Sequence, residues 1–158
     1  ILDLFEASCA DQQPISYFCP IWQEEIVGGI QWWMTFNQDT YPHDVLRLSG
    51  GSNIFATRNR RYPMEADLGL VPEGVSNDRD VRYPRVTLDE VLQADPELIL
   101  LPTEPYPYTL SEIKNFQKIF NDTRAGKSGR IVLIDGKLIM WYGVHISKAI
   151  NQLPSIFL

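Results

Sequence analysis

The sequence predicts an α/β protein, built as a three-layer sandwich with a mainly parallel sheet between helices. Two short runs, 98–101 and 131–134, are wholly apolar, which is typical of parallel strands buried on both faces. Strand-like and helix-like segments alternate along the chain, and this order favours a parallel sheet covered by helices. The 158 residues, 44% of them hydrophobic and 22% charged, suffice for one domain with a core.

The first third of the chain predicts a helix, a strand and a loop. Residues 1–10 carry apolar side chains at helical spacing and are expected to be the end of a helix. The apolar, β-rich run at 16–22 predicts the first buried strand. Residues 23–31 contain Gly28-Gly29 and are expected to form a loop.

The next segment predicts a helix, a short strand and a long connection. Residues 39–48 form an amphipathic pattern that ends at Gly50-Gly51. A short strand is expected at 53–55. The polar stretch 57–85 is longer than the roughly 15 residues usual for a loop, so it is expected to be functional or mobile.

The last part of the chain predicts alternating helices and strands. Thr87 and Glu90 have the spacing of a capping box, in which each side chain bonds the other's backbone amide at a helix start. Strands are expected at 98–101, 131–134 and 138–142. Helices are expected after Thr87, at 110–120 and at 144–153.

Large aromatic residues recur where the predicted strands end. Ligands of open α/β sheets bind outside the carboxyl ends of the strands, so these side chains are expected to form one flat wall. The alternative is that they pack locally over the core, as Tyr and Trp often do. The predicted wall consists of Trp33, Met34, Tyr83, Tyr106 and Trp141, with His145 beside it.

Composition and motifs argue against several functions. The net charge of −6 and the lack of any Lys/Arg run argue against nucleic-acid binding. No apolar run approaches the roughly 20 residues of a membrane span. The sequence lacks a phosphate-binding Gly-rich motif and a nucleophile elbow, and His43 and His145 lack metal-ligand spacing. We therefore expect no resident metal or cofactor, two buried free thiols at Cys9 and Cys19, and binding in preference to catalysis.

Two blocks of the sequence resemble class III periplasmic binding proteins, the helical-backbone receptors of ABC importers for cobalamin, haem and iron–siderophore chelates. Residues 39–55 contain Leu-Arg-Leu-Ser-Gly-Gly-Ser-Asn-Ile-Phe and resemble the family signature that ends in Gly-Gly-x-Asn-hydrophobic-Phe. Residues 83–100 resemble the block that begins with an aromatic residue and Pro and continues into a helix and a buried strand. The match covers 15–158 and is most similar to the cobalamin-type branch.

The resemblance implies a two-lobe protein that holds its ligand between α/β lobes joined by a long helix. Residues 1–13 would be the end of that inter-lobe helix and 14–158 the C-terminal lobe, so the chain is expected to be a fragment or processed piece. The resemblance places Trp33, Met34 and Tyr83 against the ligand and Asp89 on the permease. It also implies a periplasmic or extracellular location, with membrane association in Gram-positive-type cells.

The expected function is therefore that of a solute-binding protein, not an enzyme. Its ligand would be a cobalamin, a haem or a ferric chelate, and its partner an ABC permease. A dimer of the isolated lobe would cover the exposed wall. Two alternatives stay open: an α/β enzyme domain in which Asp89, Glu104 and His145 converge, and an interaction domain without a small ligand.

Overall fold

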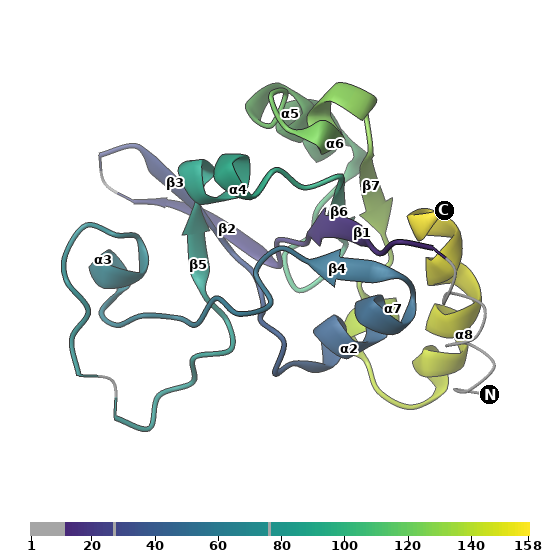
Figure 1. The fold of residues 1–158 in the computed structure, drawn as a ribbon, viewed down its shortest axis with the longest axis horizontal. Helices are drawn as coiled ribbons and strands as arrows, with labels where there is room; N and C mark the ends of the chain where they lie inside the picture. Colours follow the sequence, from purple (N-terminus) through teal and green to yellow (C-terminus); the bar gives the residue numbers. More distant parts are fainter. Residues whose placement is uncertain (1–11, 27, 76) are drawn as a thin grey trace.

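A parallel four-stranded sheet forms the centre of the protein, as predicted. The computed structural model describes residues 12–26, 28–75 and 77–158, and the helix expected at 1–10, with Cys9, lies outside them. The strand order is β4-β1-β6-β7, and all three pairings are parallel (Figure 1). The strands are β1 (Ile15–Phe18), β4 (Gly51–Asn53), β6 (Leu98–Pro102) and β7 (Ile131–Ile134).

Helices cover both faces of this sheet and complete the predicted three layers (Figure 1). Successive side chains of a strand point to opposite faces, and β6 shows the consequence. Leu98 and Leu100 join the core cluster under α2, α7 and α8, whereas Ile99 and Leu101 join the cluster under α4, α5 and α6. The helices are α2 (Tyr41–Leu48), α3 (Met64–Asp67), α4 (Leu88–Ala94), α5 (Leu110–Ile119), α6 (Arg124–Ser128), α7 (Lys137–Met140) and α8 (Val144–Gln152), and α8 runs into the 3-10 helix Leu153–Phe157.

A second sheet of three antiparallel strands lies beside the first (Figure 1). It comprises β2 (Trp22–Ile26), β3 (Ile30–Met34) and β5 (Arg85–Thr87). The prediction of a loop at 23–31 was therefore wrong, because β2 and β3 form a hairpin there. Gly28 and Gly29 have φ of 109° and 84°, a backbone conformation that glycine adopts without strain.

Three further expectations differ from the structure. The strand expected at 16–22 ends at Phe18, and Pro20, which has no N–H for a ladder, separates it from β2. The strand expected at 53–55 is centred earlier, because the Asn53 side chain accepts a hydrogen bond from the Phe55 amide and turns the chain. The strand expected at 138–142 is the helix α7, since a short apolar run fits either a strand or a buried helix.

The start of α4 confirms the predicted capping box. The Glu90 amide donates to Thr87 Oγ1 at 3.4 Å, and the Thr87 amide donates to Glu90 Oε2 at 3.0 Å. Among the described residues, no helix is long and apolar enough to cross a membrane.

Candidate functional site

A concave pocket of about 320 Å³ lies on one face of the antiparallel sheet. The register explains its composition, because Trp22 is opposite Met34 and Glu24 is opposite Trp32. Residues directly opposite in an antiparallel pair share a face, so two aromatic rings, a thioether and a carboxylate gather there. The complete lining is Ile21, Trp22, Glu24, Trp32, Met34, Met64, Arg85 and Pro105.

The side chain of Trp33 points away from this pocket. Trp33 is 0% exposed and packs into the core against Phe116 and Phe120, with Val86 opposite it on β5. The prediction that Trp33 lines the wall was wrong, because neighbouring residues of a strand face opposite ways. Met34 does line the pocket, and the exposed aromatic surface comes from Trp22, which is 38% exposed.

The loop after β6 supports the aromatic side of the pocket. The ring of Tyr106 meets the ring of Trp22 edge-on at a centroid distance of 5.6 Å, and its hydroxyl accepts a hydrogen bond from Gln23 Nε2 at 3.2 Å. The Tyr106 amide donates to the carbonyl of Ile21 at 3.1 Å. Tyr106 therefore holds Trp22 in place, while the adjacent Pro105 contributes to the lining.

A second aromatic cluster lies at the start of α8. Trp141 is 51% exposed, stacks edge-on with His145 at 5.9 Å and donates its indole N–H to Glu104. Tyr142, which is also exposed, packs against Tyr41 at 4.2 Å. Because Glu104 contacts this cluster and Pro105 lines the pocket, the loop after β6 connects the two aromatic groups.

Tyr83 does not line the pocket. Its half-buried ring packs against the core cluster under α2, and the guanidinium of Arg82 lies 5.6 Å from the ring centroid. Met34 and Tyr106 thus each lie next to Trp22, and Trp141 lies next to His145. Trp33 is buried in the core away from the pocket, whereas Tyr83 packs against the same core cluster as Met34 without lining the pocket.

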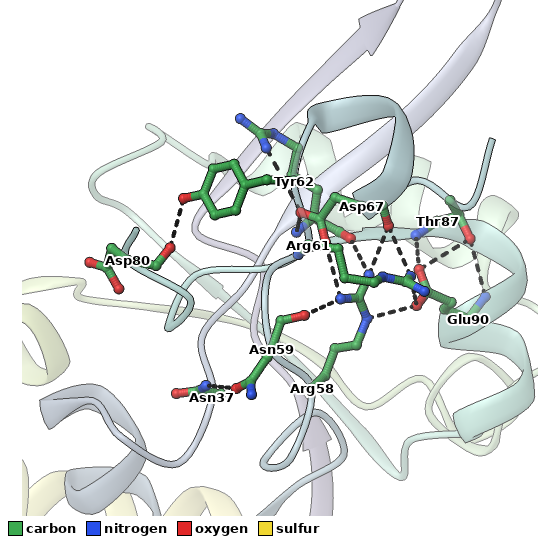
Figure 2. A network of polar contacts seen from close by, with 10 residues as sticks. Asn37, Arg58, Asn59, Arg61, Tyr62, Asp67, Asp80, Thr87 and Glu90 are labelled. Atoms are coloured by element: carbon green, nitrogen blue, oxygen red, sulfur yellow. Dashed lines mark hydrogen bonds and ion pairs between the residues drawn. The ribbon is translucent and has the colours of Figure 1, made fainter. Parts of the chain in front are cut away.

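A network of arginines and carboxylates connects the long 57–85 segment to the start of α4 (Figure 2). The Asp67 carboxylate is fully buried and accepts hydrogen bonds from the amides of Arg61 at 3.0 Å and Arg85 at 2.8 Å. The Arg58 guanidinium lies 3.0 Å from both Asp67 and Glu90. Asp67 thereby connects α3, β5 and the start of α4.

Arg85 extends from this network into the pocket. Its guanidinium carbon lies 5.2 Å from the centroid of the Trp32 ring. Burial lowers the pKa of Arg85, the positive charge of Arg60 lowers it further, and Asp67 opposes both effects. An arginine begins from a pKa far above neutrality, so the side chain stays charged.

Trp22, Glu24, Trp32 and Arg85 line the pocket but were not predicted from the sequence. A usable signal was the pair of segments Trp-Gln-Glu-Glu-Ile and Ile-Gln-Trp-Trp-Met around the two glycines, which marks a hairpin. Once the hairpin is recognised, the alternation of side chains along each strand indicates which residues face the pocket.

Asp89 is exposed in the first turn of α4, as predicted, while Glu90 forms the cap and the ion pair with Arg58. Glu104 and His145 both adjoin Trp141, but α4 and α8 pack on opposite faces of the parallel sheet. Asp89 therefore cannot join them in a catalytic site of the kind considered above.

The histidines and cysteines form no metal site within the described residues, where no cluster of three metal-binding side chains occurs. His43 is buried beside Asn53, and burial lowers its pKa. Cys19 is a buried free thiol, as predicted, and burial raises its pKa.

Comparison with known proteins relates this fold to periplasmic binding proteins. No protein-family model and no curated protein sequence matches the chain. The periplasmic vitamin B12 binding protein of Vibrio cholerae matches with a TM-score of 0.66 and 20% identity, over 99% of this chain and 49% of that chain. The periplasmic heme-binding protein of Roseiflexus sp. matches with a TM-score of 0.61 and 18% identity, over 99% and 52%.

A third structure, from an ABC-type Fe3+-hydroxamate transport system of Saccharomonospora viridis, matches with a TM-score of 0.61 and 16% identity, over 99% and 45% of the two chains. The chain thus spans about half the length of these proteins. The resemblance to class III periplasmic binding proteins is confirmed for the fold, which corresponds to a single lobe.

Proposed function

We propose that this chain is the second lobe of a solute-binding protein of an ABC importer, and that its ligand is a bulky metal chelate such as a cobalamin, a haem or a ferric siderophore. The observation that carries the proposal is the concave face with Trp22, Trp32 and Met34, on a fold whose neighbours are named as binding proteins for vitamin B12 and heme. An open, aromatic and apolar surface suits a large planar ligand, whereas the clusters around it do not form a catalytic constellation.

One lobe supplies only one side of such a site. Ligand pockets usually enclose about 70–90% of a ligand's surface, and this concavity would cover one face of a macrocycle. We therefore expect the isolated chain to bind these chelates weakly, with a Kd in the micromolar range or above.

Titration of the chain with cyanocobalamin, haemin and ferric siderophores, followed by isothermal calorimetry, tests the proposal. Trp22→Ala should weaken binding, and Trp141→Ala measures whether the second cluster takes part. Leu110→Ala, at an exposed position on α5, is the control and should bind as the unaltered chain does. Submicromolar affinity of the lobe alone would show that no second lobe is needed. Failure of every chelate to bind would refute the function.

We further propose that Asp89 docks on the permease, because it is an exposed acid whose helix start is already capped by Thr87 and Glu90. Arginine–carboxylate pairs are directional and charge-assisted, so reversing the charge should disrupt docking. In the complete two-lobe protein, Asp89→Arg should slow uptake without changing ligand affinity. Asp122→Arg, at an exposed position after α5, is the matched control, and equal uptake by the two variants would remove the docking role.

The proposed partner also defines where the protein acts. A receptor for an ABC importer works in the periplasm or at the outer surface of the membrane. In the isolated chain the pocket face is open, and we propose that a second copy of the chain covers it. Sedimentation equilibrium distinguishes this dimer from a monomer, and Trp22→Glu should dissociate a dimer that forms through the pocket face.

A further inference from the structure

The guanidinium of Arg85 is buried in the pocket with unsatisfied donors. Its side chain is 14% exposed, and within the described part of the chain Nε and Nη1 are buried without a hydrogen-bond partner. The nearest carboxylate oxygen, Oδ2 of Asp67, lies 3.8 Å from Nη1, which is beyond hydrogen-bond range. Buried charged donors are normally paired, so this arrangement calls for an acceptor.

Asp67 does not supply that acceptor because its oxygens serve other donors. Oδ1 accepts from the Arg61 amide and pairs with Arg58, and Oδ2 accepts from the Arg85 amide. The carboxylate of Glu90 likewise pairs with Arg58 and accepts a hydrogen bond from the Thr87 amide at the start of α4.

The network as a whole has more positive than negative charge. The guanidinium groups of Arg58, Arg61 and Arg85 share the two carboxylates of Asp67 and Glu90. Arg60 adds a further positive charge that acts on Arg85, and the carboxylate of Glu24, which also lines the pocket, acts on it with the opposite sign. The excess lies on the network side of the pocket, where the lining residue is Arg85.

The opposite side of the pocket combines aromatic and apolar side chains with the carboxylate of Glu24. Trp22 offers the exposed ring, Met34 lies beside it, and Trp32 forms the floor against which the Arg85 guanidinium is held. The carboxylate of Glu24 accepts a hydrogen bond from the Trp22 indole at 3.2 Å. A ligand lying on Trp22 and Met34 would therefore present one edge to Arg85.

We propose that Arg85 makes this pocket selective for chelates that carry a carboxylate on that edge, over neutral chelates of the same shape. This inference rests on the proposed function and adds the chemical class of the ligand. A carboxylate bound across Nη1 and Nη2 would give Nη1 the acceptor that it lacks, with the bidentate geometry that guanidinium and carboxylate share. The flat part of the chelate would meanwhile remain on the apolar side.

Two pairs of probes test the selectivity directly. Haemin carries two carboxylates and its dimethyl ester carries none. Cyanocobalamin is neutral at its side-chain amides, and its monocarboxylic acid derivative replaces one amide with a carboxylate. We expect the chain to bind the carboxylate member of at least one pair about tenfold more tightly, the scale of one charge-assisted interaction.

Variants assign the selectivity to Arg85. Arg85→Gln should reduce the difference within the pair to about twofold or less, and Arg85→Lys should retain part of it because the charge remains. Arg82→Gln is the matched control, since Arg82 is exposed, pairs with Asp80 and lies outside the lining. Circular dichroism checks that each variant is folded. If Arg85→Gln does not fold, Arg85→Lys and the probe pairs on the unaltered chain still decide the question.

The outcomes separate this inference from the proposed function. Equal affinity within both pairs, or tighter binding of both neutral members, would overturn the role of Arg85 while leaving chelate binding in place. Failure of all four probes to bind would overturn the proposed function and this inference with it. A preference for the carboxylate that survives Arg85→Gln would also overturn the assignment.

Discussion

Replacing Asp67 with Asn removes one charge from the centre of the network without changing the size of the side chain. The carboxylate is 0% exposed and accepts hydrogen bonds from the amides of Arg61 and Arg85 on its two oxygens. An asparagine has one oxygen and one NH₂ group, so one of those amides must face another donor. The Arg58 guanidinium, 3.0 Å away, would lose its nearest buried counter-charge.

The expected loss of stability follows from these contacts. Removing one member of a buried ion pair costs about 3–5 kcal/mol, because the remaining charge stays buried without compensation. Glu90 still pairs with Arg58 in the variant, which favours the lower end, about 3 kcal/mol. For a domain of this size each kcal/mol shifts Tm by about 2–4 °C, so Tm should fall by about 6–12 °C.

Chemical and thermal denaturation monitored by circular dichroism measures the effect. Asp80→Asn is the matched control, because Asp80 makes the same kind of pair with Arg82 at the surface, where such pairs contribute about 1 kcal/mol or less. If Asp67→Asn destabilises the protein no more than Asp80→Asn does, Asp67 does not hold the 57–85 segment and the account of the network is wrong.

Three further predictions concern the core and the sheet. Glu97 accepts two hydrogen bonds from Ser16 at 2.9 Å, and chiefly the bond from the backbone amide lowers the pKa of the carboxyl. The Glu97 carboxylate therefore stabilises the fold above the unfolded pKa of about 4.3, and this stabilisation is lost as the pH falls through the lower folded pKa. Glu97→Gln should lower the free energy of unfolding by about 1 kcal/mol at pH 7 and by much less near pH 3, which urea denaturation measures. Because burial raises the pKa of Cys19, its thiol in a Cys9→Ser variant should react with a disulfide reagent at pH 8 only after unfolding, and fast reaction of the native protein would contradict the buried placement. Trp33→Ala should destabilise the fold by about 3–5 kcal/mol in a thermal scan, whereas a change below 1 kcal/mol would show that its ring is not in the core.

The parallel sheet could be predicted because its strands are recognisable on their own. The apolar runs of β6 and β7 are buried on both faces, so their sequences carry the signal without knowledge of their neighbours. The start of α4 was likewise predictable, since Thr87 and Glu90 satisfy local hydrogen bonds.

The antiparallel sheet depends on pairing between strands: β2 and β3 pair as neighbours in a hairpin, and β5 joins β3 from a distant part of the sequence. The segment Trp22–Ile26 is largely polar, and its strand conformation follows from pairing with β3. Without that pairing, nothing assigns Trp32 and Trp33 to opposite faces, and Trp33 was predicted in the wall although its neighbour lies in the pocket. The burial of Asp67 could not be predicted for a similar reason. Its partners come from the same polar segment and from β5, and no local sequence pattern marks a buried carboxylate.

Nuclear magnetic resonance of the chain tests most directly whether the face bearing Trp22 and Met34 receives the ligand. The four tryptophans give separate indole N–H signals, and diamagnetic probes such as cyanocobalamin and gallium protoporphyrin permit titration at weak affinity. We predict that the Trp22 indole and Met34 methyl signals move with increasing ligand while the Trp33 indole signal stays in place. Shifts confined to Trp141, or the same small shift at all four indoles, would contradict the assignment of this face as the binding site.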